Sequence, residues 1–242
     1  MSFFKDKVVA ITGGSDGIGR ALVNAFIQAG AKVATCGRNY DKLYTLQLRH
    51  SNVMLHTITC DVSKEMDCKR FIDSTIKTFG GIDVLINNAG IMPLSPLAAL
   101  ETANWDAMID VNIRGVLNGI AAALPGFTAQ GSGHFVNVAS LGAHYVVPTG
   151  AVYCATKFAV WAITDGIRQE HQDIRATIIS PGVVESELGH DITDPDSAAA
   201  MAEFRSIAIT PDAIARAIRF AVGQPADVDV SEIIVRPVKG SF

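Results

Sequence analysis

Tyr153 and Lys157 in the stretch Tyr-Cys-Ala-Thr-Lys have the spacing of a proton-transfer pair. Residues four apart share one face of a helix, so the ammonium group of Lys157 is expected near the phenol of Tyr153. A nearby cation favours the phenolate, and lowering the tyrosine pKa from its usual value of about 10 makes proton transfer efficient near neutral pH. Ser140 follows an apolar run thirteen residues before Tyr153, where its hydroxyl would bond a substrate oxygen.

The tyrosine and lysine pattern also occurs by chance, with the tyrosine packed in a core and the lysine in solvent. The other three tyrosines are Tyr40, Tyr44 and Tyr145, and none of them has a lysine four residues later. Tyr153 is therefore the one tyrosine with a candidate cationic partner. The other motifs must show whether the pair is catalytic or occurs by chance.

A glycine-rich segment, Thr12 to Gly19, follows the apolar run Val8 to Thr12 and precedes a helical pattern. Glycines at a strand-to-helix turn let a pyrophosphate approach the backbone amides of the helix N-terminus. A tight turn alone would also use glycines, but the strand before it and the helix after it favour nucleotide binding. The glycine spacing is Gly-x-x-x-Gly-x-Gly rather than Gly-x-Gly-x-x-Gly.

The end of the next predicted strand bears on the choice of dinucleotide. A chain that prefers NAD presents a carboxylate there to the ribose hydroxyls, whereas this chain has Gly37 followed by Arg38. A guanidinium binds a 2′-phosphate through paired charge-assisted hydrogen bonds, so the sequence favours NADP(H) over NAD(H). The alternative is that Arg38 is only a solvated charge at the end of the strand and binds no phosphate. Asp16 in the glycine turn argues against a phosphate at this place.

Strands and helices alternate along the chain, which predicts parallel crossover units. Strands are expected at 8–12, 32–36, 53–59, 83–86, 133–138, 174–180 and 230–235, and helices at 17–29, 40–49, 64–79, 101–124, 151–171 and 211–222. The predicted fold class is α/β, with a single doubly wound (Rossmann) domain over 1–242, a seven-stranded parallel sheet and helices on both faces. Residues 185–206 are expected to be a loop-like substrate lid.

Composition narrows the class of partner. Of the 242 residues 49% are hydrophobic and 18% charged, and the net charge of −4 comes from interspersed residues, which argues against nucleic acid or membrane partners. No apolar run of membrane-spanning length and no signal segment is recognised, so a cytoplasmic location is expected. The four cysteines and six histidines show no metal-ligand spacing, so no metal is expected.

These motifs together with Asn87-Asn88-Ala89-Gly90 and Pro181-Gly182 resemble the short-chain dehydrogenase/reductase family along almost the whole chain. The resemblance implies a catalytic tetrad of Asn112, Ser140, Tyr153 and Lys157. In that tetrad Tyr153 exchanges the proton, Ser140 holds the substrate oxygen, Lys157 lowers the tyrosine pKa and binds ribose, and Asn112 positions a water in a proton relay.

The resemblance also implies the cofactor site. Besides Arg38, Tyr153 and Lys157, its expected members are Gly13, Ser15, Asp16, Gly17, Ile18, Gly19, Asp61, Val62, Asn88, Ala89, Gly90, Pro181, Gly182, Val184 and Ser186. Asp61 matches the family's adenine contact, and Ser186 stands where the family has a threonine that contacts the carboxamide.

Segments beside the tetrad are expected to form the substrate walls: Leu94, Leu141, His144, Val147, Val183, Leu188 and Met201. Most are apolar, so a small neutral carbonyl or alcohol substrate is expected. His144 has the alternative of a satisfied surface histidine, and Met201 that of packing.

The sequence thus predicts an NADP(H)-dependent oxidoreductase, a carbonyl reductase or alcohol dehydrogenase that interconverts a ketone or aldehyde and an alcohol. The alternatives are an NAD-dependent polyol or steroid dehydrogenase and a non-catalytic redox sensor that binds dinucleotide. The resemblance further implies a homo-oligomer, a dimer or tetramer, assembled through the long helices at 101–124 and 151–171 and through the C-terminal strand.

Overall fold

The computed structural model describes residues 3–50, 53–190 and 192–239. Its strands are β1 (Val8–Thr12), β2 (Lys32–Gly37), β3 (Leu55–Thr59), β4 (Val84–Asn87), β5 (Gly133–Val138), β6 (Ile174–Pro181) and β7 (Glu232–Val235). Its α-helices are α1 (Gly17–Gln28), α2 (Tyr40–Leu48), α3 (Glu65–Phe79), α4 (Thr102–Met108), α5 (Gly115–Gln130), α6 (Ala151–Glu170), α7 (Pro195–Arg205) and α8 (Pro211–Val222).

All seven strands pair in parallel within one sheet, in the order β3-β2-β1-β4-β5-β6-β7. The chain runs outward from β1 to β3, crosses back to β4 and then runs outward on the other side. The direction therefore reverses between β1 and β4, and this is the place where doubly wound sheets bind ligands. The predicted fold class is confirmed, with strand ends within about two residues of those expected from the sequence.

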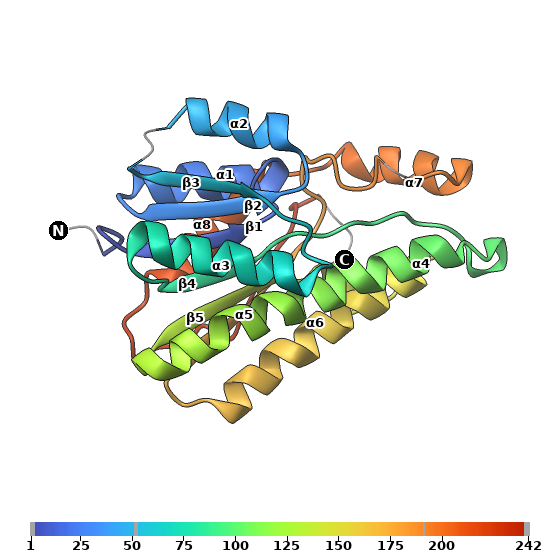
Figure 1. Ribbon diagram of the computed structural model, residues 1–242. Helices are drawn as coiled ribbons and strands as arrows, with labels where there is room; N and C mark the ends of the chain where they lie inside the picture. The colour runs from blue at the N-terminus through green and yellow to red at the C-terminus, as the bar shows by residue number, and fades with distance from the viewer. Residues whose placement is uncertain (1–2, 51–52, 191, 240–242) are drawn as a thin grey trace.

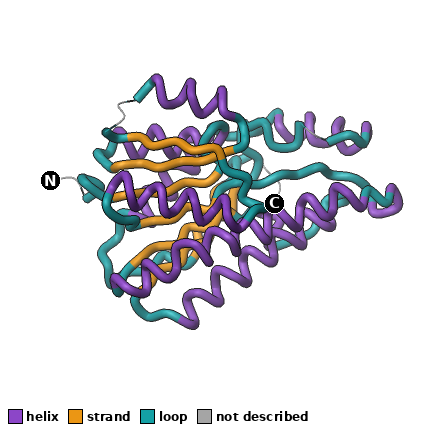
Figure 2. Tube along the Cα trace, viewed as in Figure 1, coloured by secondary structure: helices purple, strands orange, loops and turns teal. Residues whose placement is uncertain are grey.

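Helices cover both faces of the twisted sheet (Figures 1 and 2). Side chains of α1, α2 and α8 form one apolar layer, and those of α3, α5 and α6 form the other. Strand residues alternate between the layers, so that Val8 and Ala10 face the second while Val9 and Ile11 face the first. Burial on both faces explains why the strands read as continuous apolar runs in the sequence.

A short chain of polar groups is enclosed within the α5 and α6 layer. The Asn87 amide donates to Asn137 Oδ1 at 2.8 Å, and the Asn137 amide donates to Thr164 Oγ1 of α6 at 2.9 Å. On the next part of the sheet His134 Nε2 lies 2.8 Å from Thr177 Oγ1. Buried polar groups are costly unless they are paired. The bonds from Asn87 through Asn137 to Thr164 therefore fix how α6 lies on the sheet, whereas the contact of His134 with Thr177 joins β5 to β6.

The helix expected at 101–124 is longer than predicted and interrupted. A π-helical turn at Ile109–Arg114 joins α4 to α5, which continues to Gln130. By length and composition the stretch Thr102–Gln130 would suffice to cross a bilayer, a possibility that the sequence analysis did not recognise. In the fold α5 packs against α3 and strands β4 and β5, which accounts for its apolar face.

The segment expected to be a loop at 185–206 contains helix α7. Asp194 caps it by accepting hydrogen bonds from the backbone N–H and the hydroxyl of Ser197, and Pro195 occupies its first turn. An aspartate followed by proline is a helix-start signal, which the sequence analysis took for a loop. Asp191 of this segment lies outside the described residues. Figure 1 shows α7 beyond the carboxyl ends of the strands, away from the sheet.

Gly119→Ala should destabilise the protein, because an ideal Cβ at Gly119 would lie 2.4 Å from the buried Asn87 Oδ1. Overpacking of this kind costs about 1–3 kcal/mol in the free energy of unfolding, measured by urea denaturation. Gly126→Ala is the matched control on the same helix, since a Cβ there meets nothing within 4 Å and should stabilise by up to about 1 kcal/mol. Equal stabilities for the two variants would contradict the packing described for α5.

Candidate active site

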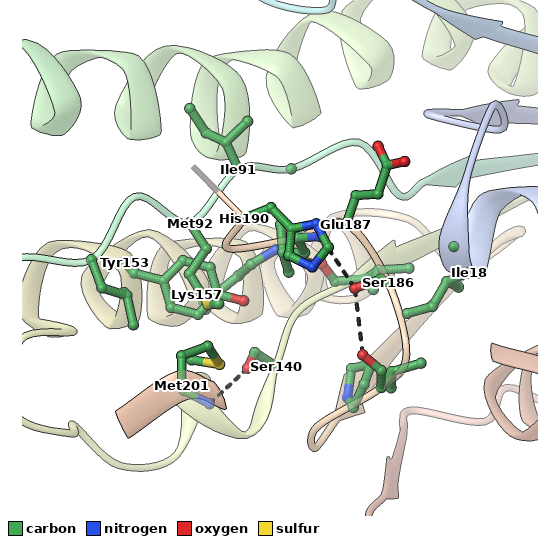
Figure 3. A pocket seen from close by; sticks show the side chains of 18 of the residues that line it. Ile18, Ile91, Met92, Ser140, Tyr153, Lys157, Ser186, Glu187, His190 and Met201 are labelled. Carbon is green, nitrogen blue, oxygen red and sulfur yellow. Dashed lines mark hydrogen bonds between the residues drawn. The ribbon is translucent and has the colours of Figure 1, made fainter. Parts of the chain in front are cut away.

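A cleft of about 1220 Å³ lies at the carboxyl edge of the sheet. Loops that follow β1, β2, β3, β4, β5 and β6 all contribute to its walls, and residues of α7 close its far end. Figure 3 shows side chains from these segments converging on the cleft, with Tyr153 and Lys157 on one side and Ile18 and Ser186 on another. Segments that are distant in sequence therefore meet in one place.

The glycine turn after β1 is tightly folded. Gly13 has a φ of +70°, and an ideal Cβ on it would lie 2.9 Å from the Cα of Ala89. At Gly19 a Cβ would lie only 2.1 Å from the Gly13 carbonyl oxygen. Gly13 lines the cleft, whereas Gly19 is the glycine that lets α1 begin so close to the strand. The turn thereby brings the N-terminus of α1 to the cleft, where the Gly17 N–H donates to Asp16 Oδ1 at 2.6 Å.

Asn88 and Thr12 hold this turn against the loop after β4. The Asn88 side-chain amide donates to the carbonyl oxygens of Thr12 and Gly13 at 3.0 and 3.2 Å. Thr12 Oγ1 in turn accepts from the backbone N–H groups of Asn88 and Ala89. Asn88, Ala89 and Gly90 line the cleft as expected, but the amide of Asn88 positions the turn.

The end of the cleft beside β2 carries Arg38, which is exposed and has no ion-pair partner among the residues that the structure describes. An ideal Cβ on Gly37 would lie 3.2 Å from Ser15 Oγ, so a side chain there would require a small shift of the serine hydroxyl. Asp61 and Val62 line the same end, with Asp61 Oδ1 accepting from the backbone and hydroxyl of Ser63.

Lys42, Glu187 and Cys60 also line this end of the cleft, and the sequence analysis did not assign any of them to the site. Lys42 lies in the first turn of α2, within reach of two segments that are far away in the sequence. No motif marks such a position, since its importance comes from the tertiary contacts alone.

The segment after β6 closes over the middle of the cleft. Pro181, Gly182, Val184 and Ser186 line it, as expected from the sequence. An ideal Cβ on Gly17 would lie 3.0 Å from the Cβ of Ser186, so this segment touches the glycine turn directly. Ile18 of the turn lies on the same side in Figure 3.

Ser140 and Tyr153 lie together at the other end of the cleft, where the Ser140 hydroxyl favours the ionised form of Tyr153. Tyr153 is only 8% exposed, and Lys157 Nζ lies 5.7 Å from the centroid of its ring. The same ammonium donates to the carbonyl oxygen of Val138 at 3.0 Å. The three side chains that the sequence placed together are therefore neighbours, on α6 and at the end of β5.

The pKa of Tyr153 differs from the value expected from sequence. Burial raises this pKa to about 12, and the nearby Ser140 hydroxyl offsets only part of the increase. Burial also lowers the pKa of Lys157 to about 8. In the protein alone the tyrosine pKa therefore lies above its ordinary value and not below it, because the cost of removing the phenolate from water dominates.

Asn112 lies in the π-helical turn and is almost fully buried. Its Oδ1 accepts from the Ile91 N–H at 2.9 Å, and its Nδ2 donates to Ile91 O at 3.0 Å and to Thr156 Oγ1 at 3.1 Å. An ideal Cβ on Gly90 would lie 3.3 Å from Asn112 Oδ1 and 3.7 Å from Lys157 Nζ. Both amide hydrogens are thus used within the protein, and Gly90 leaves a narrow space between Asn112 and Lys157.

Six of the seven expected substrate residues line the cleft: Leu94, Leu141, Val147, Val183, Leu188 and Met201. The prediction for His144 is wrong, since its Nε2 lies 3.1 Å from Ser180 Oγ and 2.8 Å from Glu232 Oε1, toward β6 and β7. Met92 and His190 also line the cleft, with side chains that project into it in Figure 3, and so does Arg205 of α7.

Comparison with known proteins decides the family. The model of the short chain dehydrogenase family matches residues 7–197. The chain belongs to this family. An uncharacterized oxidoreductase of Staphylococcus saprophyticus is 46% identical to this short-chain dehydrogenase over the full length of both chains. Another from Listeria monocytogenes is 40% identical, covering 96% of this chain and 97% of the relative.

Solved structures of short-chain dehydrogenases share the whole fold. A closed form of serine dehydrogenase complexed with NADP+ has a TM-score of 0.91 at 28% identity, covering 97% of this chain and 96% of that one. An alcohol dehydrogenase from the archaeon Thermococcus sibiricus, complexed with 5-hydroxy-NADP, has a TM-score of 0.87 at 29% identity and covers 98% of both chains. This short-chain dehydrogenase is thus an oxidoreductase by family.

Gly19→Ala should weaken dinucleotide binding in this short-chain dehydrogenase, because its Cβ would collide with the Gly13 carbonyl and open the turn. A backbone shift costing about 1–3 kcal/mol corresponds to about a 10- to 100-fold higher Kd, measured by fluorescence titration. Gly166→Ala on α6 meets nothing within 4 Å and is the control. An unchanged Kd in a folded Gly19→Ala protein would contradict the assignment of this turn.

Proposed function

We propose that the protein is an NADP(H)-dependent oxidoreductase that interconverts a ketone or aldehyde and an alcohol. The observation that carries the proposal is the arrangement of Ser140, Tyr153 and Lys157 in the same cleft as the glycine turn. One cleft thus combines a proton donor with a place for a dinucleotide.

The residues present fit a nicotinamide dinucleotide. Glycines at 13 and 17 with positive φ let the chain turn sharply before the N-terminus of α1, where a pyrophosphate would accept hydrogen bonds from backbone amides. The cleft is long enough to extend from Arg38 past Ser186 to Tyr153. When bound, the nicotinamide supplies or accepts the hydride.

Tyr153 would move the proton. In carbonyl reduction its hydroxyl donates a proton to the substrate oxygen, on which negative charge develops, while the Ser140 hydroxyl donates a hydrogen bond to the same oxygen. In alcohol oxidation the phenolate of Tyr153 takes the proton from the substrate hydroxyl. Because burial raises the pKa of Tyr153 to about 12, the protonated form needed for reduction prevails at neutral pH.

Lys157 would stabilise the charge that develops on Tyr153 during the transfer. Its pKa of about 8 leaves most of the side chain protonated at pH 7. Asn112 would support this arrangement by holding Ile91 and Thr156 in place around the π-helical turn. Asn112 would thus act as a positioning residue, and Lys157 would act through its charge.

Three observations support NADP(H) as the cofactor. Arg38 is open at the cleft end beside β2, and Gly37 stands where a carboxylate would favour NAD. Two solved short-chain dehydrogenases of the same fold are complexed with NADP+ or an NADP derivative.

Walls made of Leu94, Leu141, Val147 and Met201 favour a small neutral carbonyl or alcohol as substrate.

We infer a homo-oligomer from the outer face of α5 and α6. Ile109 and Leu117 on one helical stretch and Phe158 and Trp161 on the other are large apolar residues, each about 40% exposed. Burying such a face in a dimer or tetramer would remove it from water. Size-exclusion chromatography with light scattering measures the mass directly.

Tyr153→Phe should lower kcat about 10²–10⁴-fold, because it removes the proton donor while keeping the ring that packs in the cleft. The assay follows NADPH oxidation with a panel of aliphatic, aryl and β-keto carbonyl compounds. Tyr44→Phe, on the exposed face of α2, is the matched control and should retain full activity. Undiminished turnover in Tyr153→Phe would exclude Tyr153 as the donor. Binding of NADPH by the wild type without turnover of any compound would favour a dinucleotide sensor.

The two reaction directions should differ in their response to pH. With the pKa of Tyr153 near 12, the phenolate fraction rises tenfold for each pH unit, so kcat/KM for alcohol oxidation should rise steeply from pH 6 to about pH 8 and level off as Lys157 loses its charge. Reduction needs the phenol, which already prevails, and should not increase with pH over that range. Initial rates in both directions test this, and an oxidation rate independent of pH would contradict it.

A further inference from the structure

Three charged side chains from separate segments form a bridge at one end of the cleft. Lys42 Nζ lies 2.8 Å from Asp16 Oδ2 and 2.6 Å from Glu187 Oε2. Asp16 is the N-cap of α1, Lys42 belongs to the first turn of α2, and Glu187 follows Ser186 after β6. One ammonium thus connects the glycine turn to the segment that closes over the cleft.

The bridge lies at the end of the cleft that also carries Arg38. All four residues line the cleft, and Asp16, Lys42 and Glu187 also line a second hollow of about 310 Å³ beside it. Lys42 is four residues after Arg38, and Asn39 between them caps α2 by accepting from the Lys42 N–H. The Glu187 carboxylate is visible above Ser186 in Figure 3. The two cations therefore approach the same end of the cleft.

The charges at this end would not by themselves favour a phosphate. Asp16 and Glu187 contribute two carboxylates, and Arg20 Nη2 lies 3.8 Å from Asp16 Oδ1 on the outer side. A phosphate monoester carries about −1.5 to −2 charges at neutral pH and would be repelled by both carboxylates if Lys42 and Arg20 did not offset their charge. The side chains of Lys42 and Glu187 are 37% and 62% exposed, so their ion pair is weak and readily exchanged.

We propose that Lys42 is a specificity-determining residue for the 2′-phosphate of the dinucleotide, acting beside Arg38, and that Glu187 competes with the phosphate for the Lys42 ammonium. This inference rests on the proposed function, because it takes an NADP-type cofactor as the ligand. Its consequence is that the two partners of one ion pair have opposite effects on affinity. Removing the cation weakens NADPH binding, whereas removing the Glu187 charge strengthens it.

The test measures equilibrium binding of NADPH and NADH by fluorescence titration, without turnover. Lys42→Met should raise the Kd for NADPH about tenfold or more and change the Kd for NADH less than about threefold, since one close charge pair is worth about 1–3 kcal/mol. Glu187→Gln should lower the Kd for NADPH about threefold and leave NADH unaffected. In the double variant the benefit of Glu187→Gln should vanish, because the two residues act through one contact.

Two controls accompany the variants. Lys69→Met removes another exposed lysine that pairs with Asp73 on α3, outside the cleft, and should leave both Kd values unchanged. Arg38→Ala should weaken NADPH binding selectively and shows that the assay reports the phosphate. Urea unfolding confirms that each variant is folded.

The outcomes separate this inference from the proposed function. If the wild type binds NADH more tightly than NADPH, the proposed cofactor and this inference both fail. If the wild type prefers NADPH but Lys42→Met weakens both dinucleotides equally, or Glu187→Gln weakens NADPH, the bridge is only structural. In that case the inference fails while the proposed function stands.

Discussion

Four hydrogen bonds between the ends of β1 and β4 hold the rest of the site in place. Thr12 and Gly13 on one side exchange these bonds with Asn88 and Ala89 on the other, at the point where the strand order reverses. The glycine turn depends on this contact, since a Cβ on Gly13 would already collide with Ala89. Gly90, two residues beyond Asn88, then leads to the space between Asn112 and Lys157. The contact between the ends of β1 and β4 therefore fixes the position of the two halves of the cleft relative to each other.

The catalytic end depends on burial as much as on proximity. Tyr153 and Lys157 are each less than 10% exposed, and their pKa values move apart, that of the tyrosine up to about 12 and that of the lysine down to about 8. Both shifts have the same origin, because a low-dielectric surrounding disfavours whichever form is charged. A substrate oxygen that gains charge in this place is stabilised by fixed donors rather than by water.

The sequence was most informative where one pattern dictates one structure. Alternating apolar strands and amphipathic helices predicted the sheet, and the short glycine spacing predicted the turn that Gly13 and Gly19 make. The proximity of Ser140 and Tyr153 followed from a strand end facing a helix. The prediction failed where a contact is made only in three dimensions. His144 is turned toward Glu232 by a partner from the far end of the chain, and Lys42 reaches the cleft through Asp16 and Glu187.

His134 is a buried residue of β5 whose ring lies 2.8 Å from Thr177 Oγ1 of β6. Burial lowers the pKa of His134 to about 3, so its ring is neutral near pH 7. In the unfolded chain the same imidazole takes up a proton below about pH 6.5. Stability from this residue is therefore complete above pH 6.5 and is lost as the solution is acidified toward pH 3, by about 1.4 kcal/mol for each pH unit. A single histidine buried in the sheet thus makes the whole molecule sensitive to acid, and sets a lower limit on the pH at which the protein stays folded.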